Sequence, residues 1–273
     1  MKILLIGFGH TGKDIANGLF VIGHKIFFIS DKKEKSRFKQ VSVDSAPKDI
    51  GCIIIVLSTL SDEKRKKITY KVKNTYDLRH SELKGNINAI KEYISFLNDS
   101  NADRIIIVSN PVDEITNYLC KNVPNKRIFG FGMQLDVNRF SKKLKKKVDC
   151  IGVHGKAIPL IDYDSEDKYN KILSDIDREL LAFVKKNGIP HKIAGSEFIK
   201  FFNGLTSKKK NIVYASQYIK RSFLDIKDIA IFLPLIIKDG KIIGIKKLSI
   251  NNIERRLFLN ETRHLKKEML KLK

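Results

Sequence analysis

The chain has 273 residues, 42% of them hydrophobic, which is enough for a full-sized core in one unit or two closely joined domains. No apolar run reaches the ~18 to 20 residues of a membrane helix, and the N-terminal sequence lacks a signal-peptide cleavage site, so we expect a cytoplasmic protein without a membrane partner. The net charge of +23 would attract nucleic acid, but the lysines are spread along the chain rather than gathered in one arm. We therefore expect no specific nucleic-acid binding.

The first half of the sequence alternates strand-like and helix-like segments. Apolar runs at 2–6, 25–31, 51–57 and 104–110 predict strands, and a long helix is expected over 79–97. Continuous apolar runs such as GCIIIVL are typical of parallel strands that are covered on both faces. The sequence therefore predicts an α/β fold whose N-terminal part, residues 1–130, is a Rossmann domain with a doubly wound parallel sheet.

The pattern changes after residue 130. Helices are expected at 135–147, 164–187 and about 196–221, and a β-hairpin is expected around Asp239-Gly240. A last helix should begin near Asn251, which stands three residues before Glu254 in the spacing of a capping box. We interpret residues 131–273 as an α+β substrate domain.

The three cysteines, Cys52, Cys120 and Cys150, lie far apart in the sequence. No pair has the CxxC spacing and no pair of histidines lies nearby, so neither a disulfide framework nor a metal site is indicated. We expect all three to act as buried apolar side chains.

A glycine-rich loop follows the first predicted strand and opens a helix. In GFGHTG, Gly7, Gly9 and Gly12 have the spacing that permits a tight turn and close approach to a pyrophosphate. Asp31 follows 19 residues after Gly12, at the end of the second strand, where a carboxylate can bond a ribose hydroxyl and would repel a 2′-phosphate. We predict an NAD site that includes these residues together with His10 and Thr11. The adjacent Lys32 and Lys33 would soften the preference for NAD over NADP.

Four further segments complete a distinctive set of motifs. They are LRHSELKGNIN (78–88), SNPVDEITNYL (109–119), FGMQLDVNRF (131–140) and GVHGKAIP (152–159). In this order and spacing, and with the glycine loop, they resemble the lactate/malate dehydrogenases, a family of NAD-dependent 2-hydroxyacid dehydrogenases. The resemblance covers residues 1 to 160 well, and the remainder agrees only in pattern.

The resemblance implies a histidine as the acid/base. Hydride transfer to or from a secondary alcohol requires a proton to move at the oxygen, and an imidazole that titrates near neutrality suits that step. The family pattern places His154 in this role, between glycines that leave room for the ring and the substrate. Asp136 is then expected to bond the other ring nitrogen and to stabilise the imidazolium.

The same resemblance assigns the substrate contacts. Arg139 would grip the substrate carboxylate in a two-pronged contact, and Arg79 would polarise the reacting carbonyl when its loop closes. Asn110 would face both nicotinamide and substrate, and Asn86 would contact the cofactor. The residue six positions before the loop arginine reads the far end of the substrate in this family, and here it is Lys73. A cation at that place favours malate and oxaloacetate over lactate and pyruvate, which are the expected small-molecule partners.

The sequence departs from the family pattern in three places. Lys156 and Ala157 follow the His-Gly pair, where an acidic residue and a serine are common. The stretch from Asp31 to Ile53 is short and lacks the helix of the main subunit contact, so a homo-oligomer would need an altered interface. The loop 60–78 is long and basic, and we favour a solvated charge run over an anion site there.

Other interpretations stay open for the single residues and for the whole chain. His154 alone fits the tip of a turn, Asp136 a helix cap, Arg139 a surface charge and Asn110 a turn former. A non-catalytic Rossmann-like binding protein with a basic, nucleic-acid-attracting surface is the main alternative, and it has no need for four such residues together. An NAD-dependent glycosidase is disfavoured by the short chain and the lack of a Cys/His cluster.

Overall fold

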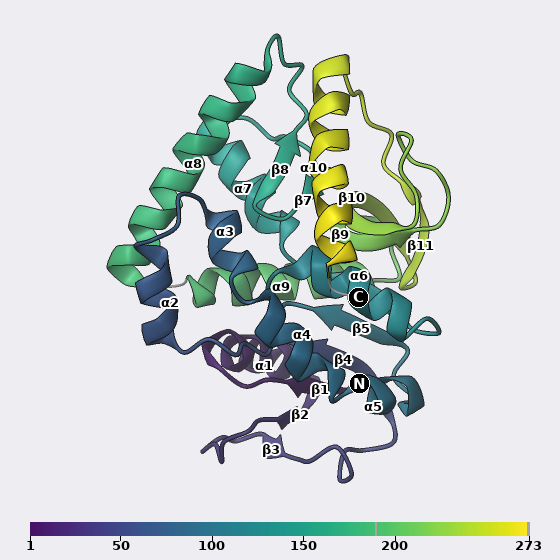
Figure 1. Ribbon diagram of the computed structural model, residues 1–273. Coiled ribbons are helices and arrows are strands. Elements are labelled where there is room, and N and C mark those ends of the chain that lie inside the picture. Colours follow the sequence, from purple (N-terminus) through teal and green to yellow (C-terminus); the bar gives the residue numbers. More distant parts are fainter. Residues whose placement is uncertain (189, 272–273) are drawn as a thin grey trace.

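The computed structural model describes residues 1–188 and 190–271, and its strands form one continuous twisted sheet (Figure 1). The N-terminal strands are all parallel and lie in the order β3-β2-β1-β4-β5-β6. Their bounds are β1 (Lys2–Ile6), β2 (Lys25–Ile29), β3 (Lys39–Gln40), β4 (Ile50–Ile55), β5 (Arg104–Ile107) and β6 (Arg127–Gly130). This is the strand order of a dinucleotide-binding sheet, so the predicted Rossmann architecture is confirmed.

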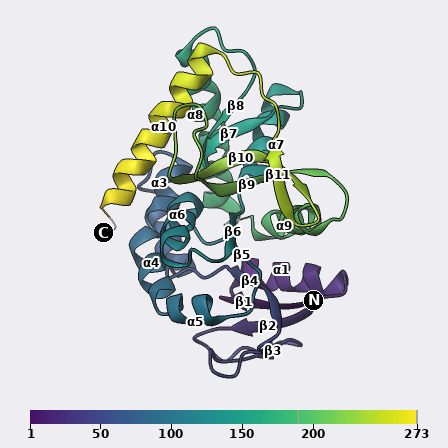
Figure 2. The ribbon, with the colours of Figure 1, turned by 90° about the vertical axis from the view of Figure 1, so that its right-hand side faces the viewer.

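Helices cover both faces of the parallel strands, as the runs of apolar residues require. Ile3 and Leu5 of β1 belong to the core on one face, whereas Leu4 and Ile6 belong to the core on the other. Figure 2 shows α1 (His10–Val21) and α9 (His191–Thr206) on the first side, and α4 (Leu83–Lys91), α5 (Ile94–Asp99) and α6 (Val112–Asn122) on the second. Because both faces are buried, the open edge for a ligand is the line where the strands end.

The second half continues the same sheet with antiparallel strands, since Gly130 of β6 pairs with Ser216 of β9. The strands there are β7 (Cys150–Val153), β8 (Lys156–Pro159), β9 (Asn211–Ile219), β10 (Ile229–Lys238) and β11 (Lys241–Ile245). Three helices pack around them: α7 (Met133–Leu144), α8 (Glu166–Asn187) and α10 (Asn252–Leu270). The mixed α+β character predicted for this half is confirmed.

Local predictions mostly agree with the structure. The hairpin turns at Asp239 and Gly240, both with positive φ, and links β10 to β11. Asn251 and Glu254 form the predicted capping box, in which each side chain accepts a hydrogen bond from the other residue's backbone N–H. Cys52 and Cys150 are buried, whereas Cys120 is only partly buried.

Two helix predictions were wrong. The helix expected over 196–221 ends at Thr206, because 211–219 pairs along its whole length with β10 as strand β9. The helix expected over 79–97 is split into α3 (Thr75–His80), α4 and α5. The turn at Ser81 and Glu82 lets α3 leave the sheet and carry Arg79 toward α7, while α4 keeps its apolar side on the core.

The stretch between β2 and β4 holds only the short strand β3 within the described chain, in line with the missing helix expected there. The basic loop does contain a helix, α2 (Asp62–Thr69), which packs against α8. None of the helices in the described ranges combines the length and the apolar content needed to cross a membrane.

Candidate active site

The glycine loop has the geometry of a phosphate cradle. Gly7 has φ +102°, and a Cβ there would lie 2.6 Å from the backbone of Leu57, so only glycine fits the close approach of β1 and β4. At Gly9 an added Cβ would meet no atom within 4 Å, which leaves open space beside the first turn of α1. That turn carries no acidic side chain and no side-chain cap, so its N–H groups are available to a phosphate.

The other predicted cofactor residues line the same edge of the sheet. Asp31 is exposed two residues beyond β2, Thr11 lies in the first turn of α1, and the ring of His10 lies 5.2 Å from that of His191. Asn86 is fully buried, accepts hydrogen bonds from the backbone N–H and hydroxyl of Thr59, and donates to the carbonyl of Asn110 at 2.7 Å. Asn86 therefore holds the Asn110 loop from inside the protein, and its own contact with a cofactor stays a prediction.

Asn110 offers the sharpest test of whether a cofactor fits. Its Oδ1 is buried and accepts no hydrogen bond from the residues that the structure describes. A buried acceptor without a donor destabilises the protein, so a ligand N–H such as that of a carboxamide would bind favourably to this atom. The open glycine cradle, the exposed Asp31 and this oxygen together fit a nicotinamide dinucleotide laid across the strand ends.

The predicted acid/base pair is assembled in the structure. Nδ1 of His154, between β7 and β8, lies 2.6 Å from Oδ2 of Asp136 on α7. The backbone N–H of Gly155 donates to the same oxygen at 3.0 Å, and that of His154 donates to Asp113 at 2.8 Å. These bonds fix both the ring and its loop, and they leave Nε2 as the ring nitrogen for a ligand.

Burial and charge set the protonation of this pair. Burial lowers the pKa of His154 below its usual range, with Arg79 adding to this effect and Asp136 opposing it. For Asp136, burial acts in the opposite sense but is outweighed by His154 and Arg139, which hold the pKa of the carboxyl well below its usual range. At rest the imidazole of His154 is thus neutral and can accept a proton, and the carboxylate of Asp136 beside it is ionised.

Two arginines approach the pair from different helices. Arg139 on α7 donates to Oδ1 of Asp136 at 2.8 Å and is partly exposed to the cavity. Arg79 on α3 donates to the hydroxyl of Thr75 at 3.0 Å and lies against Gly155, where a Cβ would come within 2.3 Å of its Nη1. Burial lowers the pKa of Arg79 to about 10, so it remains a cation at neutral pH.

His154, the two arginines and Asn110 border one cavity of about 130 Å³. It lies between the strand ends, α3, α7 and α9, and its polar lining includes Thr11, Arg79, Asn110, Arg139 and His154. The predicted cofactor edge and the predicted acid/base site therefore meet in the same space, as hydride and proton transfer require.

The structure adds residues that the sequence analysis missed. Arg65 of α2 lines the cavity, and its guanidinium bonds both carboxylate oxygens of buried Glu82 at 3.1 and 3.2 Å. It also donates to the hydroxyl of Ser58 at 2.7 Å. The basic run gave no sign of this arginine. In the structure Arg65 and Ile68 are partly buried and Thr69 is buried, so this side of α2 turns inward. Asp113 lies within the segment 109–119, and the sequence did not indicate that it accepts from the backbone N–H of His154.

Lys73 is not brought to the cavity. It is exposed just before α3 and is not among the residues of the cavity wall, because the helix begins at Thr75 and turns Thr75, Leu78 and Arg79 inward instead. The role of Lys73 as the residue that reads the far end of a substrate thus stays a prediction that the lining of this cavity does not support. Arg65 is the cation that the fold supplies in addition to Arg79 and Arg139.

Lys156 points away from the acid/base pair. Its Nζ lies 3.1 Å from Glu261 of α10 and 4.4 Å from the centre of the Tyr76 ring. Ala157 is fully buried in the core. The departures from the family pattern after His-Gly thus change the contacts behind the site rather than its lining.

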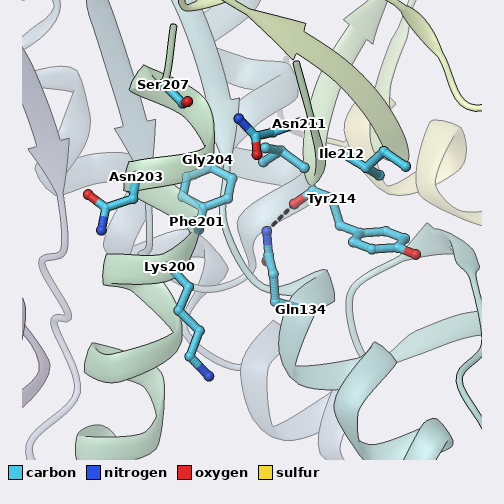
Figure 3. Close-up of a pocket in the computed structure, with 10 residues that line it drawn as sticks. Gln134, Lys200, Phe201, Asn203, Gly204, Ser207, Asn211, Ile212 and Tyr214 are labelled. Carbon is cyan, nitrogen blue, oxygen red and sulfur yellow. Dashed lines mark hydrogen bonds between the residues drawn. The ribbon is translucent and has the colours of Figure 1, made fainter. Parts of the chain in front are cut away.

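A second, larger cavity of about 440 Å³ opens between α7, α9 and β9 (Figure 3). Gln134, Lys200, Asn203, Asn211 and Tyr214 are among its lining residues, and Gln134 donates to the carbonyl of Tyr214. None of the predicted site residues borders it. The predicted site residues that line a cavity therefore line the smaller one.

The fold and the site together are those of a Rossmann-type dehydrogenase, with a buried histidine–carboxylate pair beside the predicted cofactor site. No family model matches the chain. It is 23% identical to a malate dehydrogenase of Bacteroides thetaiotaomicron over 94% of this chain and 93% of the relative. It is also 22% identical to L-lactate dehydrogenase 2 of Enterococcus faecalis over 68% of each chain.

Solved structures agree on the fold. A lactate dehydrogenase of Cryptosporidium parvum, complexed with lactic acid and nicotinamide adenine dinucleotide, matches with a TM-score of 0.77 at 16% identity over 99% of this chain and 97% of that one. A malate dehydrogenase of Plasmodium falciparum matches with a TM-score of 0.74 at 14% identity over 99% and 98%. The resemblance to the lactate/malate dehydrogenase family is thereby confirmed.

Proposed function

We propose that the protein is an NAD-dependent dehydrogenase that interconverts a small 2-hydroxy acid and its 2-oxo acid, with malate and oxaloacetate preferred over lactate and pyruvate. The observation that carries the proposal is the pairing of His154 with Asp136 beside a cavity that His154, Arg79, Arg139 and Asn110 line, where the Asn110 oxygen has no partner among the described residues. The sequence similarity to malate dehydrogenases over nearly the whole chain supports it.

In this proposal each side chain has one task. Arg139 binds the substrate carboxylate with the N–H groups not used by Asp136, and Arg79 polarises the carbonyl oxygen. His154 gives a proton to that oxygen through Nε2 during reduction and takes it back during oxidation. Asp136 holds the ring by Nδ1 and stabilises its cationic form. When bound, NAD supplies or accepts the hydride at the carbon.

The cofactor would rest on the groups already described. The pyrophosphate fits the open space at Gly9, a ribose hydroxyl fits the carboxylate of Asp31, and the carboxamide fits Oδ1 of Asn110. Thr11, in the first turn of α1, also borders the cavity. A 2′-phosphate would face the carboxylate of Asp31, which favours NAD over NADP.

The charges around the cavity favour a dicarboxylate. Its walls contain Arg65, Arg79, Arg139 and Glu82, with Asp136 directly behind His154. When His154 is protonated, as reduction requires, these groups comprise four cations and two carboxylates, a net charge of +2. Oxaloacetate would neutralise that charge, whereas pyruvate would leave one cation uncompensated in a partly dry site.

The direct test is NADH oxidation by the purified protein with a panel of 2-oxo acids. We expect turnover with oxaloacetate, a lower kcat/KM with pyruvate, and little reaction with a 3-oxo acid that cannot place its carboxylate on Arg139. Cofactor binding without turnover of any member of the panel would contradict the proposal and favour the non-catalytic alternative.

A further inference from the structure

A second group of charged residues lies behind the active site, where α3, α6 and α10 meet. His80 on α3 lies at ion-pair distance from two carboxylates, with Nδ1 3.4 Å from Glu114 of α6 and Nε2 3.4 Å from Glu268 of α10. Nδ1 is buried and makes no hydrogen bond within the described residues, so these contacts are purely ionic. Figure 2 shows the C-terminal end of α10 beside α3 and α6. Glu114 is buried, so its carboxyl group must find its polar partners within the protein.

This group is connected to the catalytic side chains by adjacency in the chain. His80 follows Arg79, Glu114 follows Asp113, which accepts from the His154 backbone, and Lys156 follows Gly155. Tyr76, one helical turn before His80, donates to Glu114 at 3.0 Å, stacks on the His80 ring and receives Lys156 over its face. A shift of α3 relative to α6 and α10 would therefore move Arg79 relative to His154.

We propose that His80, in its protonated form, is a positioning residue that joins α3 to α6 and α10 and so holds Arg79 beside the reacting carbonyl. The inference rests on the proposed function, since Arg79 matters only if a carbonyl is polarised in this cavity. A neutral imidazole cannot act as a cation between two carboxylates, so the bridge weakens once His80 loses its proton.

The sign of the pH dependence follows from the groups that face His80. Glu114 raises the pKa of His80 above its usual range, burial opposes this, and Glu268 adds to the increase. Tyr76 on the same helix stacks on the His80 ring, and His264 on α10 faces Tyr76. Lys271 donates a hydrogen bond to Glu268, the second carboxylate beside His80. The bridge is therefore complete below this raised pKa and is lost as the pH rises through it.

Oxidation of the hydroxy acid separates His80 from His154. That direction needs neutral His154, so kcat/KM rises with pH through the lowered pKa of His154. We expect a second, alkaline decrease as His80 deprotonates. His80→Gln should lower kcat by about tenfold at neutral pH and remove the alkaline decrease, because Arg79 is displaced at every pH. His80→Lys, which keeps a cation at high pH, should retain activity where the wild type has lost it.

Two further variants control the test. Glu268→Gln should shift the alkaline decrease to lower pH, because that carboxylate raises the pKa of His80. Arg263→Gln removes an exposed cation of the same helix and should leave the profile unchanged. An alkaline decrease that persists in both His80→Gln and His80→Lys, or that is unmoved in Glu268→Gln, would overturn the proposal.

A measurement without turnover distinguishes failure of this inference from failure of the proposed function. Amide hydrogen exchange of residues 75–80 should be faster in His80→Gln than in the wild type at the same pH, with protection restored by His80→Lys. Equal protection in all three proteins would contradict the bridge even if the enzyme is active. The expected differences in a protein that turns over no 2-oxo acid would retain the bridge and reject only the catalytic assignment.

Discussion

Nδ1 of His154 lies 2.6 Å from Oδ2 of Asp136, and both side chains are almost completely buried. The same carboxylate accepts from Gly155 and from Arg139, so one buried anion orients the proposed acid/base, its loop and the arginine proposed to bind the substrate. Replacement of His154 and replacement of Asp136 should therefore have different effects on the kinetics.

The side chain of His154 is expected to carry the proton. His154→Asn should lower kcat in both directions by about 10² to 10⁴, the usual effect of losing a positioned acid/base, while the affinity for NADH stays within a few-fold of the wild type. Steady-state kinetics together with a direct cofactor titration would measure this. Unchanged kcat would refute the assignment.

Asp136 should determine both the rate and the acid limb of the pH profile. For hydroxyacid oxidation we expect kcat/KM to rise through a midpoint below the 6.5 of an ordinary histidine, because burial lowers the pKa of His154. Asp136→Asn should reduce kcat by about 10² to 10⁴ and move the midpoint to still lower pH, since the carboxylate opposes the lowering. A midpoint that moves upward would contradict the charge interaction.

Arg65 and Lys73 provide a matched pair for substrate choice, because one lines the cavity and the other is exposed. Arg65→Gln should lower the preference for oxaloacetate over pyruvate by about tenfold, since a cation is lost where the second carboxylate would lie. Lys73→Gln should leave the ratio of the two kcat/KM values unchanged. The opposite result would restore Lys73 as the specificity residue.

The unpaired Glu82 left by Arg65→Gln needs its own control, because a buried carboxylate would also repel a dicarboxylate. In the double variant Arg65→Gln, Glu82→Gln, both members of the pair are neutral. If the preference for oxaloacetate returns there, the substrate does not bind Arg65 itself, and the arginine acts only by neutralising Glu82.

Asp31 is expected to select the cofactor. Asp31→Ala should reduce the ratio of kcat/KM for NADH over NADPH by about tenfold, because a ribose hydroxyl loses its acceptor and a 2′-phosphate loses a repelling charge. Kinetics with both cofactors on the wild type and the variant would test this. A wild-type preference for NADPH would show that Lys32 and Lys33 dominate the pocket.

Short segments of the sequence were enough to predict the fold of the N-terminal half and most of the candidate site residues. The glycine loop between a strand and a helix, and the parallel-type apolar runs, predicted a fold that the strand order confirms, because backbone conformation and burial on both faces are encoded within a few residues. The motifs contain His154, Asp136, Arg79 and Arg139, and the structure brings His154 and both arginines to one cavity with Asp136 bonded to the His154 ring.

What the sequence left open depended on contacts between segments far apart in the chain. Residues 211–219 have an apolar pattern compatible with a helix, and only pairing with β10 makes them a strand. The basic run around Arg65 resembles a solvated surface until Glu82 and Ser58 give one of its cations a buried partner. Lys73 was predicted from its distance along the chain to Arg79. The orientation of the short helix α3 is instead set by its packing against α8 and α10, and this packing leaves Lys73 exposed.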